Sequence, residues 1–296
     1  MSELPLEVRL EAMGLTPIHP HSFRYEDEYS HVEYRKSYTY ISEVDPPTLE
    51  DIPTLSIFTR KDNTHSWEFV GLVSTGYRFV GNGALIARIK QMVSADNAIL
   101  TESYILHQNM CGMQYSVVIA NSTNDTRVGL LYPKIVIENS YNGTSCERIH
   151  FGIVMEGKSF QFNKFGILKQ IHSQGSNTYA QGVIQNYVQV FNTSIGEFVT
   201  SNMEKQISTE TIMKTLDLLD QIGKKRKIEI STALNAESDQ GNFTAWNLFS
   251  VLARFSAGEQ NINVQRFMNN IIERNIAIPS RMMELFKSTD RNPGQE

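Results

Sequence analysis

Hydrophobic and polar positions alternate through much of the first half of the chain, as expected for β-strands with one buried face. The pattern is clearest in residues 132–154, where Ile135 and Ile137 precede a polar segment and Ile149, Phe151 and Ile153 follow it. The polar segment contains Asn142-Gly143. This pair suits a tight turn because both residues tolerate positive φ. Residues 132–154 therefore predict a β-hairpin.

Other runs of the same kind predict an antiparallel meander around this hairpin. They cover residues 31–41, 54–59, 67–73, 99–106, 114–120, 127–131 and 159–162. Proline cannot donate a ladder hydrogen bond, so Asp45-Pro46-Pro47 and Asp51-Ile52-Pro53 are expected to be linkers or sheet edges. We expect turns where Asn, Asp, Ser and Gly gather between the runs.

Helical spacing begins in residues 84–93 and dominates after about residue 170. Apolar residues recur every three or four positions from 178 to 206, which predicts one long helix lying across the sheet. Capping signals then predict helices from Ser208 or Thr209 to Ile222, after Thr244 over 245–257, after Asn263 over 264–274, and from Pro279 or Ser280 through Phe286. A short helix over 5–13 is also expected, ending at Gly14.

Together these elements predict an α+β fold. An antiparallel β-sheet meander of about residues 30–162 would be covered by the long helix, followed by a helical C-terminal region. The change of period suggests a first region of residues 1–206, containing the sheet and its covering helix, and a second of residues 207–296.

Composition narrows the class of protein. The chain has 296 residues, 41% hydrophobic and 20% charged, which allows one large or two ordinary domains. Two cysteines, Cys111 and Cys146, argue against a disulfide scaffold. Neither a membrane-length apolar run nor a signal-peptide pattern is present, so we expect a soluble protein of the cytoplasm with no membrane partner.

No established catalytic motif is present. Gly81-Asn82-Gly83 at the start of a predicted helix could cradle a phosphate, but the rest of a dinucleotide or P-loop fingerprint is missing, which favours a structural turn. His19 and His21 have the spacing of a metal-ligand pair but have no third ligand nearby. We therefore assign no catalytic, cofactor-binding or metal-ligating residues and expect no cofactor and no enzyme activity. A site built from scattered acidic residues stays an open alternative.

One segment resembles a known family. Residues 139–145, Asn-Ser-Tyr-Asn-Gly-Thr-Ser, are similar to the NS-(Y/H)-(D/N)-G-(T/S)-S segment of phage- and plasmid-encoded proteins catalogued as domain of unknown function 932. Residues 38–41, Tyr-Thr-Tyr-Ile, and 241–249, Gly-Asn-Phe-Thr-Ala-Trp-Asn-Leu-Phe, fit the same family. Many members carry an Arg-x-x-Cys-x-Asn-Gly run after the second hairpin strand. This chain has Val-Met-Glu-Gly-Lys at 154–158, so no role of that Cys transfers.

The resemblance implies a phage or mobile-element protein. It suggests a non-catalytic inhibitor that binds a host anti-phage defence complex, with the Gabija nuclease defence as the first candidate and a second copy of the chain as a further partner. Exposed aromatic and Arg side chains are typical anchors of protein interfaces. We expect such contacts from Phe23, Arg24, Tyr25 and Tyr29.

The alternative is a single-stranded DNA-binding or annealing protein of phage recombination. A meander crossed by a long helix is similar to the core of Rad52-like annealing proteins, which is an analogy of fold only. The cations Lys224, Lys225, Arg226 and Lys227 could contact phosphates, or could complement the C-terminal end of the preceding helix. The formal net charge of −5 favours protein partners over nucleic acid.

Overall fold

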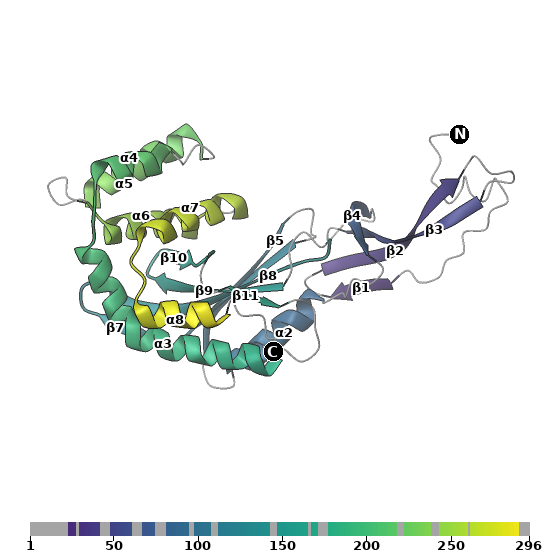
Figure 1. Cartoon of the computed structure of the whole chain (residues 1–296), viewed down its shortest axis with the longest axis horizontal. Coiled ribbons are helices and arrows are strands. Elements are labelled where there is room, and N and C mark those ends of the chain that lie inside the picture. Colours follow the sequence, from purple (N-terminus) through teal and green to yellow (C-terminus); the bar gives the residue numbers. More distant parts are fainter. Residues whose placement is uncertain are drawn as a thin grey trace.

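The structure is a computed structural model. It describes residues 23–27, 30–41, 48–60, 67–74, 81–94, 98–107, 112–142, 147–164, 167–170, 177–217, 222–237, 243–259 and 261–289. Antiparallel sheets, a long helix and a helical C-terminal region confirm the α+β class. Figure 1 shows an elongated molecule, with a small sheet at one end of the long axis and most of the helices at the other.

The first four strands form a separate sheet, here called the arm sheet. It contains β1 (Phe23–Asp27), β2 (Ser30–Ile41), β3 (Thr48–Thr59) and β4 (Glu68–Ser74) in that order. The predicted single meander is thus divided in two, because α2 (Asn82–Ser94) follows β4 and separates it from the next strand in sequence.

Proline limits the pairing inside the arm sheet. β3 continues through Pro53, so the expected linker at Asp51-Ile52-Pro53 is instead part of a strand. The β2–β3 register shifts between Lys36 and Tyr38, and the residues beside Pro53 fall in that irregularity. A proline is tolerated in a strand at such a place, since the residue need not donate to the ladder.

Seven of the following strands form the body sheet, while β12 (Gln206–Ile207) and β13 (Phe243–Thr244) pair only with each other. The order of the body sheet is β10 (Lys158–Gln161), β9 (Glu147–Met155), β8 (Gly129–Ser140), β6 (Gly112–Ile119) and β5 (Ile99–His107). Two short strands extend it: β11 (Ile167–Gln170) pairs with β9 and β7 (Thr123–Asp125) pairs with β8.

The central hairpin is formed as predicted. β8 and β9 pair antiparallel, with Ile135 opposite Phe151 and Ile137 opposite Ile149. These four side chains are completely buried. Gly143, whose positive φ the turn sequence predicts, lies outside the described residues.

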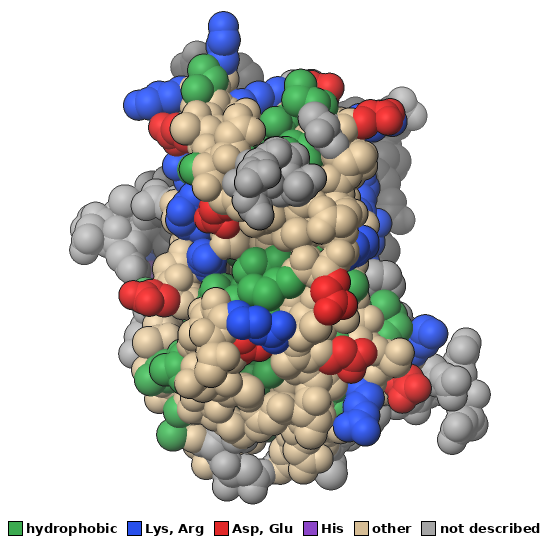
Figure 2. Space-filling model, turned by 90° about the vertical axis from the view of Figure 1, so that its left-hand side faces the viewer, with side chains coloured by type: hydrophobic (Ala, Val, Ile, Leu, Met, Phe, Trp, Pro, Cys, Tyr) green, Lys and Arg blue, Asp and Glu red, His purple; other side chains and the backbone are tan. Residues whose placement is uncertain are grey.

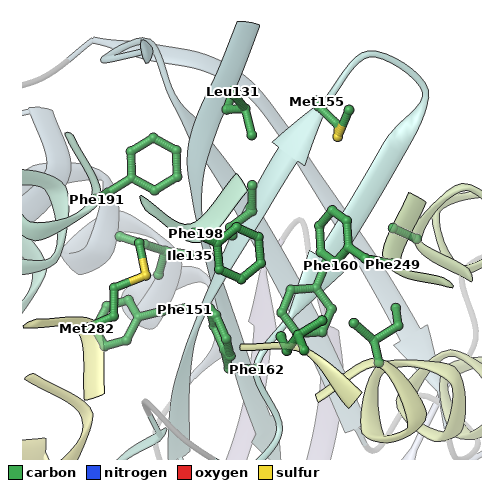
Figure 3. Close-up of a cluster of buried hydrophobic side chains, with 14 of the residues drawn as sticks. Leu131, Ile135, Phe151, Met155, Phe160, Phe162, Phe191, Phe198, Phe249 and Met282 are labelled. Carbon is green, nitrogen blue, oxygen red and sulfur yellow. The ribbon is translucent and has the colours of Figure 1, made fainter. Parts of the chain in front are cut away.

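The face of the body sheet that carries these residues holds the main core. α3 (Asn177–Glu204) confirms the long helix, and with α8 (Ser280–Thr289) it runs along one side of the body sheet (Figure 1). The rings of Phe151 and Tyr187 stack with their centroids 4.3 Å apart. Figure 3 shows Phe151, Phe160, Phe162, Phe198 and Phe249 converging from the sheet and the helices. Aromatic burial on this scale makes the body the stable part of the molecule.

The C-terminal helices share this core. α6 (Ala245–Ala257) packs beside β10, where the Phe160 and Phe249 rings lie 5.5 Å apart, and Phe249 also contacts Phe198 of α3. One buried cluster therefore runs across residue 206, the suggested boundary between the two regions.

Capping chemistry explains where these helices begin. Thr244 caps α6 as predicted, and its side chain and that of Asn247 form a reciprocal capping box. The N-cap of α7 (Ile262–Asn275) is Asn261 and not the predicted Asn263. The Asn261 side chain accepts hydrogen bonds from the backbone N–H groups of residues 263 and 264. α4 (Thr209–Asp217) begins at a predicted residue, residues 218–221 lie outside the described residues, and Ile222, the predicted last residue, is not helical. α5 (Lys224–Glu237) was not predicted, since its sequence has almost no apolar periodicity.

Candidate protein-binding surface

The two faces of the arm sheet differ in burial. On the buried face, Val32 and Ile57 are fully buried and Tyr34 and Val73 nearly so. Tyr141, from the end of β8, completes this small cluster. The arm sheet is therefore attached to the body through its inner face. On its other face, here called the outer face, Glu33 opposite Phe58 is buried, whereas Phe69 and Leu72 are exposed.

Apolar side chains lie on the outer face. Phe58 and Phe69 are opposite each other across β3 and β4, with an edge-on ring contact at 5.8 Å. On the same face, Leu72 of β4 is opposite Ser56 of β3, and Ser56 is two residues from Phe58 along β3. Phe69 is 56% exposed and Leu72 is 55% exposed. Neighbouring exposed apolar groups on one surface are typical of interaction sites, whereas isolated ones are not.

An arginine is held over this apolar surface. The guanidinium of Arg35 lies 4.4 Å from the centre of the Phe58 ring, and its Nε donates to Glu33 at 2.9 Å. Arg60 similarly lies 5.2 Å from the ring centre of Trp67. Stacked Arg and aromatic side chains lose little conformational freedom on binding. The outer face, defined as Arg35, Phe58, Phe69 and Leu72, thus has the composition of a binding hot spot.

The arm sheet joins the body through residues 139–142, the segment on which the family resemblance rests. The Tyr141 hydroxyl accepts the backbone N–H of Asn82 at 3.0 Å, and the Tyr34 hydroxyl donates to the Tyr141 carbonyl at 3.4 Å. Asn139 donates to the side chain of Asn82 at 3.0 Å. Asn142 reaches the Val70 carbonyl at 3.4 Å. These contacts give Asn82 a structural role, and its N–H at the start of α2 is used by Tyr141.

A buried ionic cluster lies on the other face of the body sheet, where α7 meets β8 and β9. Two nitrogens of Arg266 lie 3.1 and 2.7 Å from the carboxylate of Glu138, and His150 Nε2 lies 3.4 Å from it. Burial raises the pKa of Glu138, but the neighbouring His150 and Arg266 outweigh it and lower the pKa to about 2. Nearby, Glu273 of α7 accepts the backbone N–H groups of Asn163 and Lys164. The cluster fastens α7 to the sheet.

One lysine on that face is also perturbed. The ammonium of Lys134 donates to the Ser159 hydroxyl at 2.8 Å, and burial lowers the pKa of Lys134 to about 8. Among the described residues no group of three or more His, Cys, Asp or Glu side chains could hold a metal ion.

The basic run of residues 224–227 occupies the first turn of α5. Lys224 and Lys225 are exposed. Arg226 stacks on Phe255 at 4.5 Å, donates to its carbonyl and approaches Glu229. Figure 2 shows the helical end of the molecule, where Lys and Arg side chains are interspersed with Asp and Glu rather than forming one continuous basic track.

The contact residues expected from the sequence, Phe23, Arg24, Tyr25 and Tyr29, remain a prediction. Phe23, Arg24 and Tyr25 belong to β1, whose register sets Arg24 opposite Glu33. Tyr29 lies outside the described residues. Sequence reasoning missed Phe58, Phe69 and Leu72, because alternation shows that a strand has two faces but not which face another element covers.

Comparisons with known proteins found no relative of this chain. No protein-family model, curated protein or solved structure matches the chain. The family resemblance therefore remains a prediction from residues 38–41, 139–145 and 241–249. None of the helices in the described part of the chain is long and apolar enough to span a membrane.

Proposed function

We propose that the protein is a phage or mobile-element binding protein that inhibits a host anti-phage defence complex without catalysing a reaction. The outer face of the arm sheet is its contact surface. A Gabija-type nuclease complex is the first candidate partner, a choice motivated by the resemblance of residues 139–145. Such a partner acts in the host cytoplasm, where we expect the protein to bind it.

The observation that carries this proposal is the pair of half-exposed side chains Phe69 and Leu72 beside the stacked Arg35 and Phe58. Keeping apolar area in water is unfavourable by about 25 cal/mol per Å², so a partner that covers this face gains that free energy. The arm sheet also projects from the body (Figure 1), which leaves room for a large partner. A specific interface buries about 1,600 Å² in total, so the outer face would form its centre rather than its whole extent.

The test uses the purified full-length protein and a purified Gabija-type nuclease complex. Co-elution and inhibition of DNA cleavage are measured for the wild type, Phe69→Glu and Leu72→Glu. We expect each variant to weaken binding at least about tenfold, since a carboxylate would be buried in the apolar centre of the interface.

The matched control is Ile228→Glu in α5. Ile228 is 58% exposed, close to the value for Phe69, but lies among the helices rather than on the arm sheet. It should bind and inhibit like the wild type. Equal behaviour of Phe69→Glu and the wild type would reject the outer face as the contact surface, and failure of the wild type to inhibit would reject the Gabija-type partner.

The single-stranded DNA reading has one observation in its favour. A helix N-terminus carries a partial positive charge, so the exposed Lys224 and Lys225 are placed where they disfavour α5 and do not stabilise it. If they contact phosphates, affinity for single-stranded DNA should fall steeply with salt. Replacing both residues, Lys224→Gln with Lys225→Gln, should reduce the slope of log affinity against log salt concentration by about 1.4, because each phosphate contact on a single strand contributes about 0.7. Binding that is negligible near physiological salt would remove this alternative.

A further inference from the structure

A lysine of the body sheet reaches across a neighbouring strand to a serine. Lys134 of β8 is opposite Gly152 of β9, and Ser159 of β10 is opposite Val154 of β9. Because side chains alternate along a strand, this register puts Lys134 and Ser159 on the same face of the sheet, away from the main core. The ammonium of Lys134 donates to the Ser159 hydroxyl at 2.8 Å. Gly152 has no side chain, which leaves room for the lysine to cross β9.

Gly152 also allows β10 to lie close to β9. A Cβ atom at residue 152 would lie 2.3 Å from the carbonyl oxygen of Phe160 and 3.2 Å from the Cα of Gln161. Both are backbone atoms of β10, so any other residue would push this strand away. The meeting of Lys134 with Ser159 is therefore built into the backbone of the sheet. It is not a chance contact of two flexible surface side chains.

No carboxylate balances the charge of this ammonium. Among the described residues Lys134 forms no ion pair, and the hydrogen bond to Ser159 is the only one of its side chain. Glu138 is on the same face but four residues further along β8, roughly 13 Å away, and its carboxylate is bound by Arg266 and His150. A partly buried charge without a counter-charge is unfavourable. Burial accordingly lowers the pKa of Lys134 to about 8.

The lysine and the serine together offer donors to a ligand. The Ser159 hydroxyl accepts from Lys134 and keeps its own proton to donate, and the ammonium keeps two further N–H groups. Both residues are partly exposed, so a small molecule can reach them. We propose that Lys134 and Ser159 bind a phosphate group, either as the free ion or at the end of a phosphate monoester. Three donors from two strands suit a tetrahedral oxyanion, whose negative charge would offset the ammonium. This site is distinct from the outer face and does not depend on the proposed function.

Calorimetric titration of the purified full-length protein tests the site. The ligands are inorganic phosphate, adenosine monophosphate and acetate, each added at constant ionic strength. We expect a dissociation constant of about 1 mM for at least one of the two phosphate ligands. Lys134→Met should weaken binding at least about tenfold, and Ser159→Ala about threefold. Lys287→Met, which removes an exposed ammonium from α8, is the control and should bind as the wild type.

The folding of the main variant is checked separately. Lys134→Met keeps the length of the side chain and removes an unpaired charge, so it should melt no lower than the wild type. A purely structural lysine would instead lower the melting temperature when replaced.

A titration of Lys134 by carbon NMR of its Cε atom gives a local readout, with its signal assigned by its loss in Lys134→Met. The register places Tyr132 of β8 and His150 of β9 beside Lys134 on this face as the other titratable groups, whereas β6 and β10 contribute Val118 and Ser159. Bound phosphate should raise the pKa of Lys134 above its value of about 8. Phosphate affinity should fall about tenfold or more from pH 7.5 to 9.5, because the ammonium then loses its proton.

The three ligands distinguish the sources of the anion. Binding of inorganic phosphate alone would assign the site to the free ion, and binding of adenosine monophosphate alone would assign it to a monoester. Both results support the proposal. It is overturned if neither phosphate ligand binds at about 10 mM, if Lys134→Met binds as tightly as the wild type, or if acetate binds as tightly as phosphate.

Discussion

The arm sheet and the body sheet are both antiparallel, but they differ in what covers them. The body sheet lies against α3, α6 and α8, and its core contains the fully buried Phe151, Phe191 and Phe198. Among the described residues, the buried cluster of the arm sheet contains five side chains, none of them from a helix and one of them, Tyr141, contributed by the body. Because stability follows the apolar area removed from water, the body should hold the chain together while the arm is free to display a surface.

The largest expected effect is in the body. Phe151→Ala removes a ring that contacts both Tyr187 and Phe286, and it should lower the free energy of unfolding by about 3–5 kcal/mol. Denaturant unfolding followed by far-ultraviolet circular dichroism measures the loss. A loss below about 1 kcal/mol would show that the body core is not the main source of stability.

The next effect concerns the buried ionic cluster. The folded-state pKa of Glu138 is about 2, below the ordinary value of 4.5. The corresponding stabilisation is complete above pH 4.5 and is lost as the pH falls from 4.5 to 2. Glu138→Gln should therefore lower the free energy of unfolding at neutral pH by about 2–3 kcal/mol and reduce its pH dependence in that window.

The control for this prediction is Glu156→Gln, since Glu156 is exposed in the turn before β10. Unfolding midpoints of both variants are measured from pH 2 to 7. Parallel pH profiles for wild type and Glu138→Gln would show that Glu138 does not couple folding to protons.

A smaller effect is expected at the junction of arm and body. Tyr141→Phe removes the acceptor of the Asn82 N–H and should cost about 1–2 kcal/mol. Since Tyr141 also packs in the arm cluster, amide exchange should quicken in β2 and β3 more than in β8. Hydrogen exchange with mass spectrometry separates the two regions, and equal acceleration in both would mean that the arm does not open on its own.

The smallest effect on stability is expected on the outer face. Phe69→Ser should change the free energy of unfolding by less than about 0.5 kcal/mol, because the side chain is already more than half exposed. Thermal melting measures it beside Ile57→Ala, at the buried position next to Phe58 on β3, which should cost about 2 kcal/mol or more. A large loss for Phe69→Ser would assign the outer face to folding rather than to binding.

The sequence by itself determined the local elements. Asn142-Gly143 between two alternating runs specified the hairpin, the four-residue apolar repeat specified α3, and Thr244 specified the start of α6. Each rests on interactions within a few residues, or on a period that the backbone imposes, so it can be read without knowing the fold. The sequence did not predict α5, because apolar residues in this segment do not recur at helical spacing.

Only the tertiary structure decided which faces are covered. The separation of the arm sheet from the body sheet, the joining role of Tyr141 and the exposure of Phe69 and Leu72 all depend on residues far apart in the chain. The meeting of Glu138 with Arg266, 128 positions apart, is of the same kind. The alternating sequence pattern predicts that a strand has two different faces. Tertiary packing decides which of these faces is exposed to water, and the candidate binding surface consists of residues on the exposed face.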